Sequence, residues 1–250
     1  MSDNIPRELT ELLERLGLAE RGELRAVEGR MRRLGRELPQ FQSIWVDALL
    51  HARLLTPYQA AEINAGRGTD LRIGPYVLTA KASSLGYARR FAARSAESDD
   101  RVELIVIEGL PVAAAAERLG ALAARALDLV TDGLAPVLEC GAESQRIWAM
   151  VRPDPGRTAA EHIVRHGRMP PGVVLEIARQ MAAALEHIER AGMAHGDVSA
   201  TALVLNERGQ AALLAPGLRP IVRPAEGFAN SDLAPEYCDG LAPERIDGGV

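Results

Sequence analysis

The chain has 250 residues, of which 47% are hydrophobic and 25% are charged, and its formal net charge is −5. These values are ordinary for a globular protein that buries a sizeable core, and the negative charge leaves no basic footprint for a nucleic acid. No apolar run reaches the roughly 18 residues that span a bilayer, and the N-terminus lacks the basic and apolar regions of a secretory signal. The sequence therefore predicts a cytoplasmic protein without a membrane segment.

Cysteine and histidine are sparse and scattered. Cys140 and Cys238 lie far apart, and the five histidines do not cluster at the spacing of zinc ligands, so no metal site is predicted. Among the 29 basic residues, only Lys81 is a lysine. Arginine is a poor replacement wherever a compact ammonium group must reach a phosphate oxygen.

Residues 1–70 are expected to form a small helical module. Three stretches carry apolar residues at helical spacing: 6–16, 20–34 and 41–50. Thr56 followed by Pro57 is typical of a helix start, because the hydroxyl can cap the first turn and proline suits the first helical position.

From Leu71 onward the pattern alternates between short strands and helices. Strands are expected over 76–78, 87–93, 102–107, 134–138, 147–151, 203–205 and 212–214. Helices are expected over 113–130 and over 173–191, and the second of these is amphipathic. The Pro155-Gly156 break indicates two lobes joined by a linker near residues 150–156.

Short motifs follow one another in this second part of the chain. Ser83, Leu85 and Ala88 stand at the spacing of the three glycines in G-x-G-x-x-G. The run Val-Glu-Leu-Ile-Val-Ile over 102–107 has the pattern of V-A-x-K, with Ile105 in place of the lysine. The other motifs are His195-Gly196-Asp197, similar to H-R-D, Ala215-Pro216-Gly217, similar to D-F-G, and A-P-E sequences within 233–236 and 241–244.

In their order and spacing these motifs resemble the bacterial Ser/Thr protein kinase family of the Hanks type. The resemblance implies an α+β, bilobal kinase-like fold over 71–250, preceded by the helical module over 1–70. The β-rich N-lobe would cover 71–151 and a partial helical C-lobe 152–250. More helices normally follow A-P-E, so the chain is expected to be a piece of a longer protein or an unusually short version.

Phosphoryl transfer depends on positioning and on charge stabilisation, and the resemblance implies that most residues for these tasks are replaced. Side chains at Ser83, Leu85 and Ala88 would keep backbone N–H groups away from the phosphates. The other replacements are Arg90 for the valine over the adenine, Ile105 for the lysine, Leu122 for its glutamate partner, Ala202 for the metal-binding asparagine and Ala215 for the metal-binding aspartate.

Three residues of the H-R-D and D-F-G regions are retained. Asp197 keeps the catalytic aspartate position, but a structural role in its loop is expected for it. His195 is expected to be a packed core residue, and Gly217 to meet a backbone requirement. Ile105 and Leu122 would exchange a buried ion pair for an apolar pair, which is often neutral or stabilising.

The resemblance therefore implies a pseudokinase without cofactor or metal, acting as a protein-interaction or regulatory scaffold. Its partner would be another protein, such as an active kinase or a signalling component. One alternative is a divergent Ser/Thr kinase that retains ATP binding or weak phosphotransfer, with Lys81 recruited from the preceding strand. Another is a metal-independent ligand sensor in which Arg90 and Arg152 meet an anion, although solvated arginines are the expected outcome there.

Overall fold

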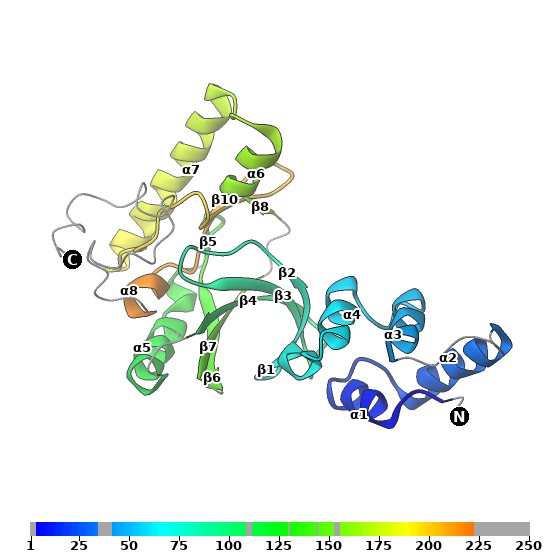
Figure 1. The fold of residues 1–250 in the computed structure, drawn as a ribbon. Coiled ribbons are helices and arrows are strands. Elements are labelled where there is room, and N and C mark those ends of the chain that lie inside the picture. Colours follow the sequence, from blue (N-terminus) through cyan, green and yellow to red (C-terminus); the bar gives the residue numbers. More distant parts are fainter. Residues whose placement is uncertain are drawn as a thin grey trace. The chain divides into compact units, whose positions relative to one another are not determined.

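The computed structural model describes residues 4–34, 42–108, 112–129, 131–143, 145–152 and 156–222 (Figure 1). The described chain divides into two compact units: unit 1 takes the residues up to 81 together with 92–101, and unit 2 takes 82–91 and the residues from 102 onward. Unit 1 thus joins the helices of the expected N-terminal module to strands that the sequence assigned to the kinase-like part. The A-P-E motifs lie outside the described residues.

Unit 1 is built mainly from short helices. Its elements are α1 (Arg7–Arg15), α2 (Arg21–Leu34), α3 (Gln42–His51), α4 (Pro57–Asn64), the 3-10 helix η1 (Gly68–Leu71) and the antiparallel pair β1 (Arg72–Ile73) and β2 (Tyr76–Lys81). The helices follow the predicted apolar periodicity: Leu9 and Leu13 are buried on α1, and Trp45, Val46 and Leu49 on α3. β3 (Arg89–Ser95) begins in unit 2 and ends in unit 1.

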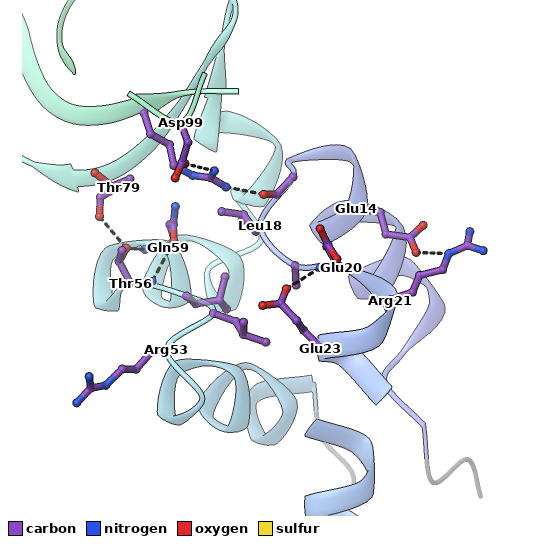
Figure 2. Close-up of a pocket in the computed structure, with 15 residues that line it drawn as sticks. Glu14, Leu18, Glu20, Arg21, Glu23, Arg53, Thr56, Gln59, Thr79 and Asp99 are labelled. Carbon is purple, nitrogen blue, oxygen red and sulfur yellow. Dashed lines mark hydrogen bonds and ion pairs between the residues drawn. The ribbon is translucent and has the colours of Figure 1, made fainter. Parts of the chain in front are cut away.

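The predicted start of α4 at Thr56 and Pro57 is confirmed. The Thr56 hydroxyl accepts a hydrogen bond from the Gln59 N–H, and the Gln59 side chain accepts one from the Thr56 N–H, which completes a capping box. The Thr56 hydroxyl also donates to the Thr79 carbonyl at 2.6 Å (Figure 2). The Gln59 side-chain amide donates to the Leu78 carbonyl at 2.8 Å, so both side chains attach α4 to β2.

Unit 2 contains the remaining strands and helices, except that the first residue of β4, Arg101, belongs to unit 1. They are β4 (Arg101–Glu108), α5 (Val112–Ala124), the 3-10 helix η2 (Ala126–Leu129), β5 (Leu134–Ala135), β6 (Val137–Glu143), β7 (Arg146–Val151), β8 (Arg157–Thr158), α6 (Ala159–His166), α7 (Pro171–Arg190), β9 (Leu203–Leu205), β10 (Ala211–Leu214) and α8 (Leu218–Val222). The helix expected over 113–130 therefore ends earlier, at Ala124, and continues as a 3-10 turn. None of the helices in the described ranges is long and apolar enough to cross a membrane.

Two groups of paired strands organise unit 2. β4, β7 and β6 are antiparallel neighbours, with Ile105 opposite Ala149 and Ala149 opposite Cys140. In the other sheet the order is β5-β10-β9-β8, and β10 runs parallel to β5 but antiparallel to β9. Pro136 alone separates β5 from β6, so the chain passes from one sheet to the other at a residue that cannot donate a ladder hydrogen bond.

The long helix α7 confirms the helix expected over 173–191. Its inward residues Ile177, Met181, Ala184 and Ile188 are buried, and they share an apolar cluster with Leu213 of β10. Leu185, also expected inward, is half-buried at the edge of this cluster. α6 was not predicted. It begins at a second capping box, in which the Thr158 hydroxyl accepts from the Glu161 N–H and the Glu161 carboxylate accepts from the Thr158 N–H.

Candidate functional site

Six of the eight replaced residues of the expected nucleotide site lie together in one apolar core of unit 2, and Ser83 and Arg90 are not members of it. Leu85, Ala88, Ile105, Leu122, Ala202 and Ala215 all belong to a single cluster of buried residues, and none of them is more than 8% exposed. The structure therefore brings together, in one place, residues that lie as much as 130 positions apart in the sequence, from 85 to 215.

These side chains reach the core from several different elements. Ile105 lies in the middle of β4 and is fully buried, whereas Leu122 comes from the last turn of α5. Ala202 precedes β9 and Ala215 follows β10, so the ends of the second sheet supply the other side. Val137, Ile147, Leu214 and Leu218 are further members of the same cluster.

The side chains of this core exclude water and offer no charged or polar group of their own at the four positions considered next. Mg²⁺ requires oxygen ligands, and a triphosphate requires donors or cations. Ile105, Leu122, Ala202 and Ala215 offer only hydrocarbon side chains. Across the described ranges, no group of three or more His, Cys, Asp or Glu residues is arranged to hold a metal ion.

Arg90 is buried, so the expectation that it would be solvated is wrong. Its Nη2 donates to Oε2 of Glu103 at 2.6 Å, and the two side chains are only 2% and 11% exposed. Its Nη1 donates to the Ser83 hydroxyl at 3.1 Å. The loop that carries the first glycine position is therefore held to β3 by a buried arginine, while Arg152 is exposed as expected.

Glu103 is a site residue that sequence reasoning missed. It is the single charged residue inside the otherwise apolar run 102–107. A carboxylate in a buried strand requires a partner, and alternation along a strand places it on the same face as Ile105, two residues on. Those two facts were a signal that a cation must lie close to β4.

The loop around Asp197 is tightly folded on its own backbone. His195 is buried as expected, and its Nδ1 accepts a hydrogen bond from the Asp197 N–H at 3.2 Å. The Gly217 N–H donates to the His195 carbonyl at 2.9 Å, and the φ angle of Gly217 is +78°. Glycine tolerates this left-handed conformation, so Gly217 meets the backbone requirement expected of it.

Arg219 of α8 closes the same loop from the other side. This buried guanidinium donates from Nη1 to the Gly196 carbonyl at 3.1 Å. Gly196 itself has a φ of +79°, and a Cβ there would come within 2.3 Å of Pro220 Cγ. Asp197, 8% exposed, is therefore held in a closed loop by its neighbours.

Burial lowers the pKa of His195 to about 4, because desolvation disfavours the imidazolium. The unfolded chain has the ordinary pKa of about 6.5 and so binds more protons between these two values. Stability should therefore fall as the pH drops from about 6.5 towards 4, by up to about 1.4 kcal/mol per pH unit from this group. The free energy of unfolding can be measured by urea titration at a series of pH values. It should fall less steeply with decreasing pH for His195→Gln than for the unmodified protein.

His51 provides the matched control for this experiment, because it is exposed at the end of α3. His51→Gln should leave the slope unchanged. Equal slopes for His195→Gln and the unmodified protein would contradict the burial of a neutral His195.

A cavity of about 880 Å³ lies within unit 1 (Figure 2). Its charged groups mostly engage one another: Glu14 pairs with Arg21 at 2.7 Å, and Arg94 pairs with Asp99 at 2.6 Å. The Glu23 carboxylate accepts the Glu20 N–H at 2.8 Å. This depression therefore offers few free charges to a ligand.

Comparisons with known proteins bear on the fold alone. No family model matches the sequence, and no curated protein sequence matches it. Among solved structures, the chain is similar to the protein kinase Rad53, residues 1–466, in complex with AMP-PNP, with a TM-score of 0.54 and 14% sequence identity. The match covers 70% of this chain and 44% of that one. The fold is thus kinase-like, and the chain spans less than half of the kinase structure that it matches.

Proposed function

We propose that this kinase-like protein is a pseudokinase, which acts as a protein-interaction or regulatory scaffold and does not transfer phosphate from Mg-ATP. One observation carries the proposal: the residues at the expected lysine, glutamate, asparagine and aspartate positions are apolar and share one closed core. The protein's own side chains fill this core, so its stability does not depend on a bound nucleotide.

The energetic argument rests on the contacts that such a core cannot make. Hydrogen bonds to charged groups contribute about 1.5–3 kcal/mol each. Ile105 and Ala215 would each forgo at least one such contact with phosphate or metal. The loss of several contacts together removes most of the affinity of a nucleotide that binds at micromolar to millimolar concentration.

A scaffold role follows from what the core retains. Ile105 on β4 and Leu122 on α5 belong to the same apolar cluster, and burial of such side chains contributes roughly 1.5–3 kcal/mol each. That contribution keeps α5 packed against the sheet without any activating conformational change. The outer surface of unit 2 is then constant, and a protein partner such as an active kinase can bind it in one conformation.

The nucleotide test gives a direct prediction. The protein should show no saturable binding of ATP at millimolar concentration, with or without magnesium, in calorimetric titration and in thermal-shift measurements. An active kinase measured in parallel establishes that the assay detects the expected heat and stabilisation. A melting temperature that rises only when ATP and magnesium are both present would overturn the proposal.

The variant Lys81→Ala separates the proposal from a divergent kinase. Lys81 is exposed and is the sole lysine of the chain. Under the pseudokinase proposal, Lys81→Ala and the unmodified protein should behave alike towards ATP. ATP binding that disappears in Lys81→Ala would instead favour a kinase that has recruited this lysine.

A further inference from the structure

A groove in unit 2 lies between α6, the first turns of α7 and the turn that joins β9 to β10. It has a volume of about 420 Å³. Figure 1 shows α6 beside the N-terminal half of α7, with β8 at the foot of α6. The residues that line the groove include the apolar side chains of Met169, Val173, Ile177 and Leu205, together with Arg157 and His162. The groove lies on other elements than the replaced nucleotide residues.

Exposed apolar side chains occur on the two helices that border this groove, and one of them, Val173, lines it. Six large hydrophobic residues are exposed in the described part of the chain, and five of them lie on α6 or at the start of α7: Ile163, Val164, Val173, Val174 and Leu175. Val164 is 86% exposed and Leu175 is 71% exposed, so these are not core residues at the margin of burial. A concentration of apolar surface of this kind marks an interaction site.

The charges around the groove favour an acidic partner. Arg157, Arg165, Arg168 and Arg208 are all exposed on α6, on the strand and loop beside it, or on the β9–β10 turn. None of these four arginines makes an ion pair with another described residue.

Most acidic residues on the elements that border the groove already have a hydrogen-bond or ion-pair partner. The Glu161 carboxylate caps α6, and Glu176 pairs with Arg179, which leaves Glu207 as the acid that lines the groove. On the elements that border the groove, the side chains without an ion-pair partner are thus four arginines against Glu207, so positive charge is in excess there. Arginine binds carboxylates in a bidentate manner.

We propose that this groove binds a short segment of a partner protein in which apolar side chains are flanked by aspartate or glutamate. The apolar side chains of the segment pack on Val173 and Ile177, and its carboxylates meet Arg157 and the arginines at the end of α6. The inference rests on the proposed scaffold function, because it names the chemistry of the partner that such a scaffold recruits.

The test selects peptides on the protein itself. A phage-displayed library of random peptides of about a dozen residues is panned on the 250-residue chain, and the enriched peptides are synthesised and titrated by fluorescence anisotropy. We expect enriched sequences that combine Asp or Glu with Leu, Ile, Val or Phe. Because each charge-assisted contact is worth about 1.5–3 kcal/mol, Arg157→Glu should weaken their binding about tenfold or more. Val173→Glu should do the same through the apolar lining of the groove.

Val198→Glu is the matched control, since Val198 is the sixth exposed apolar residue and lies outside the groove. It should leave peptide affinity unchanged, and unchanged melting curves should show that all three variants are folded. No enrichment, enrichment of basic peptides, or equal binding by Arg157→Glu and Val173→Glu would each overturn the groove proposal. No nucleotide is present, so such a failure is distinct from magnesium-dependent ATP binding, which would overturn the scaffold function itself.

Discussion

Replacing Ile105 with lysine should cost about 3–5 kcal/mol of unfolding free energy, because the substitution places an uncompensated charge in an apolar core. Ile105 is fully buried, and its neighbours in the cluster include Leu122, Ala202 and Ala215. The free energy of unfolding of a typical protein is only 5–15 kcal/mol in total, so the variant should be close to unfolding. Urea titration at neutral pH measures the loss.

The pH dependence of this variant identifies the cause. A buried lysine has a lowered pKa in the folded state, so the unfolded chain binds more protons and the deficit should shrink as the pH rises towards 10. Ile105→Val is the matched control, and it should cost only about 0.5–1.5 kcal/mol with no such pH dependence. A stable Ile105→Lys protein at neutral pH would contradict the burial of this residue.

The same variant should not regain phosphate transfer, even when it is combined with Ala215→Asp. Catalytic groups that act as a unit are strongly non-additive, and Leu122 and Ala202 would still be unable to hold the lysine or a metal. Phosphorylation of a generic substrate by either variant would show that the core opens to a nucleotide.

The second large effect concerns the ion pair between Arg90 and Glu103. Arg90→Met should destabilise the protein by about 3–5 kcal/mol, because it removes the guanidinium from a buried carboxylate. It also removes the hydrogen bond to Ser83, so the loop over 82–88 loses one of its attachments to β3. Urea unfolding would measure the first effect, and proteolysis within this loop the second.

Two controls make this prediction specific. The double variant Arg90→Met with Glu103→Leu should recover most of the loss, because an apolar pair of similar volume often replaces a buried ion pair without penalty. Arg89→Met removes an arginine next to Arg90 whose partner Glu108 is exposed, and it should cost less than about 1 kcal/mol. Equal losses for Arg89→Met and Arg90→Met would contradict the burial of the Arg90 pair.

Local patterns predicted much of the secondary structure. α7 and the start of α4 follow from the helical spacing of Ile177, Met181 and Ile188 and from the Thr56-Pro57 cap, both of which act within a few residues. α6 was missed because it is only 8 residues long and its large apolar residues, Ile163 and Val164, are exposed. Its signal was the capping box of Thr158 with Glu161.

The site shows which contacts local sequence patterns cannot predict. The resemblance placed Ile105, Leu122, Ala202 and Ala215 at related positions, and the structure puts them in one cluster. The partnership of Arg90 with Glu103 could not be predicted, because it depends on how two strands lie beside each other and not on any spacing along the chain. The exposure of the apolar side chains on α6 and α7 could not be predicted either, because an apolar residue in a helix is ordinarily expected to face inward.

The shared core has a consequence for how unit 2 opens. The cluster takes Ile105 and Ile147 from the β4–β7–β6 strands and Val204 and Leu214 from the β5-β10-β9-β8 sheet. Neither sheet can separate from the other without exposing these side chains to water at about 25 cal/mol per Å². Amides in the middle of β4 and of β10 should therefore exchange with solvent through the same opening event, as one foldon, and not as two lobes that move independently.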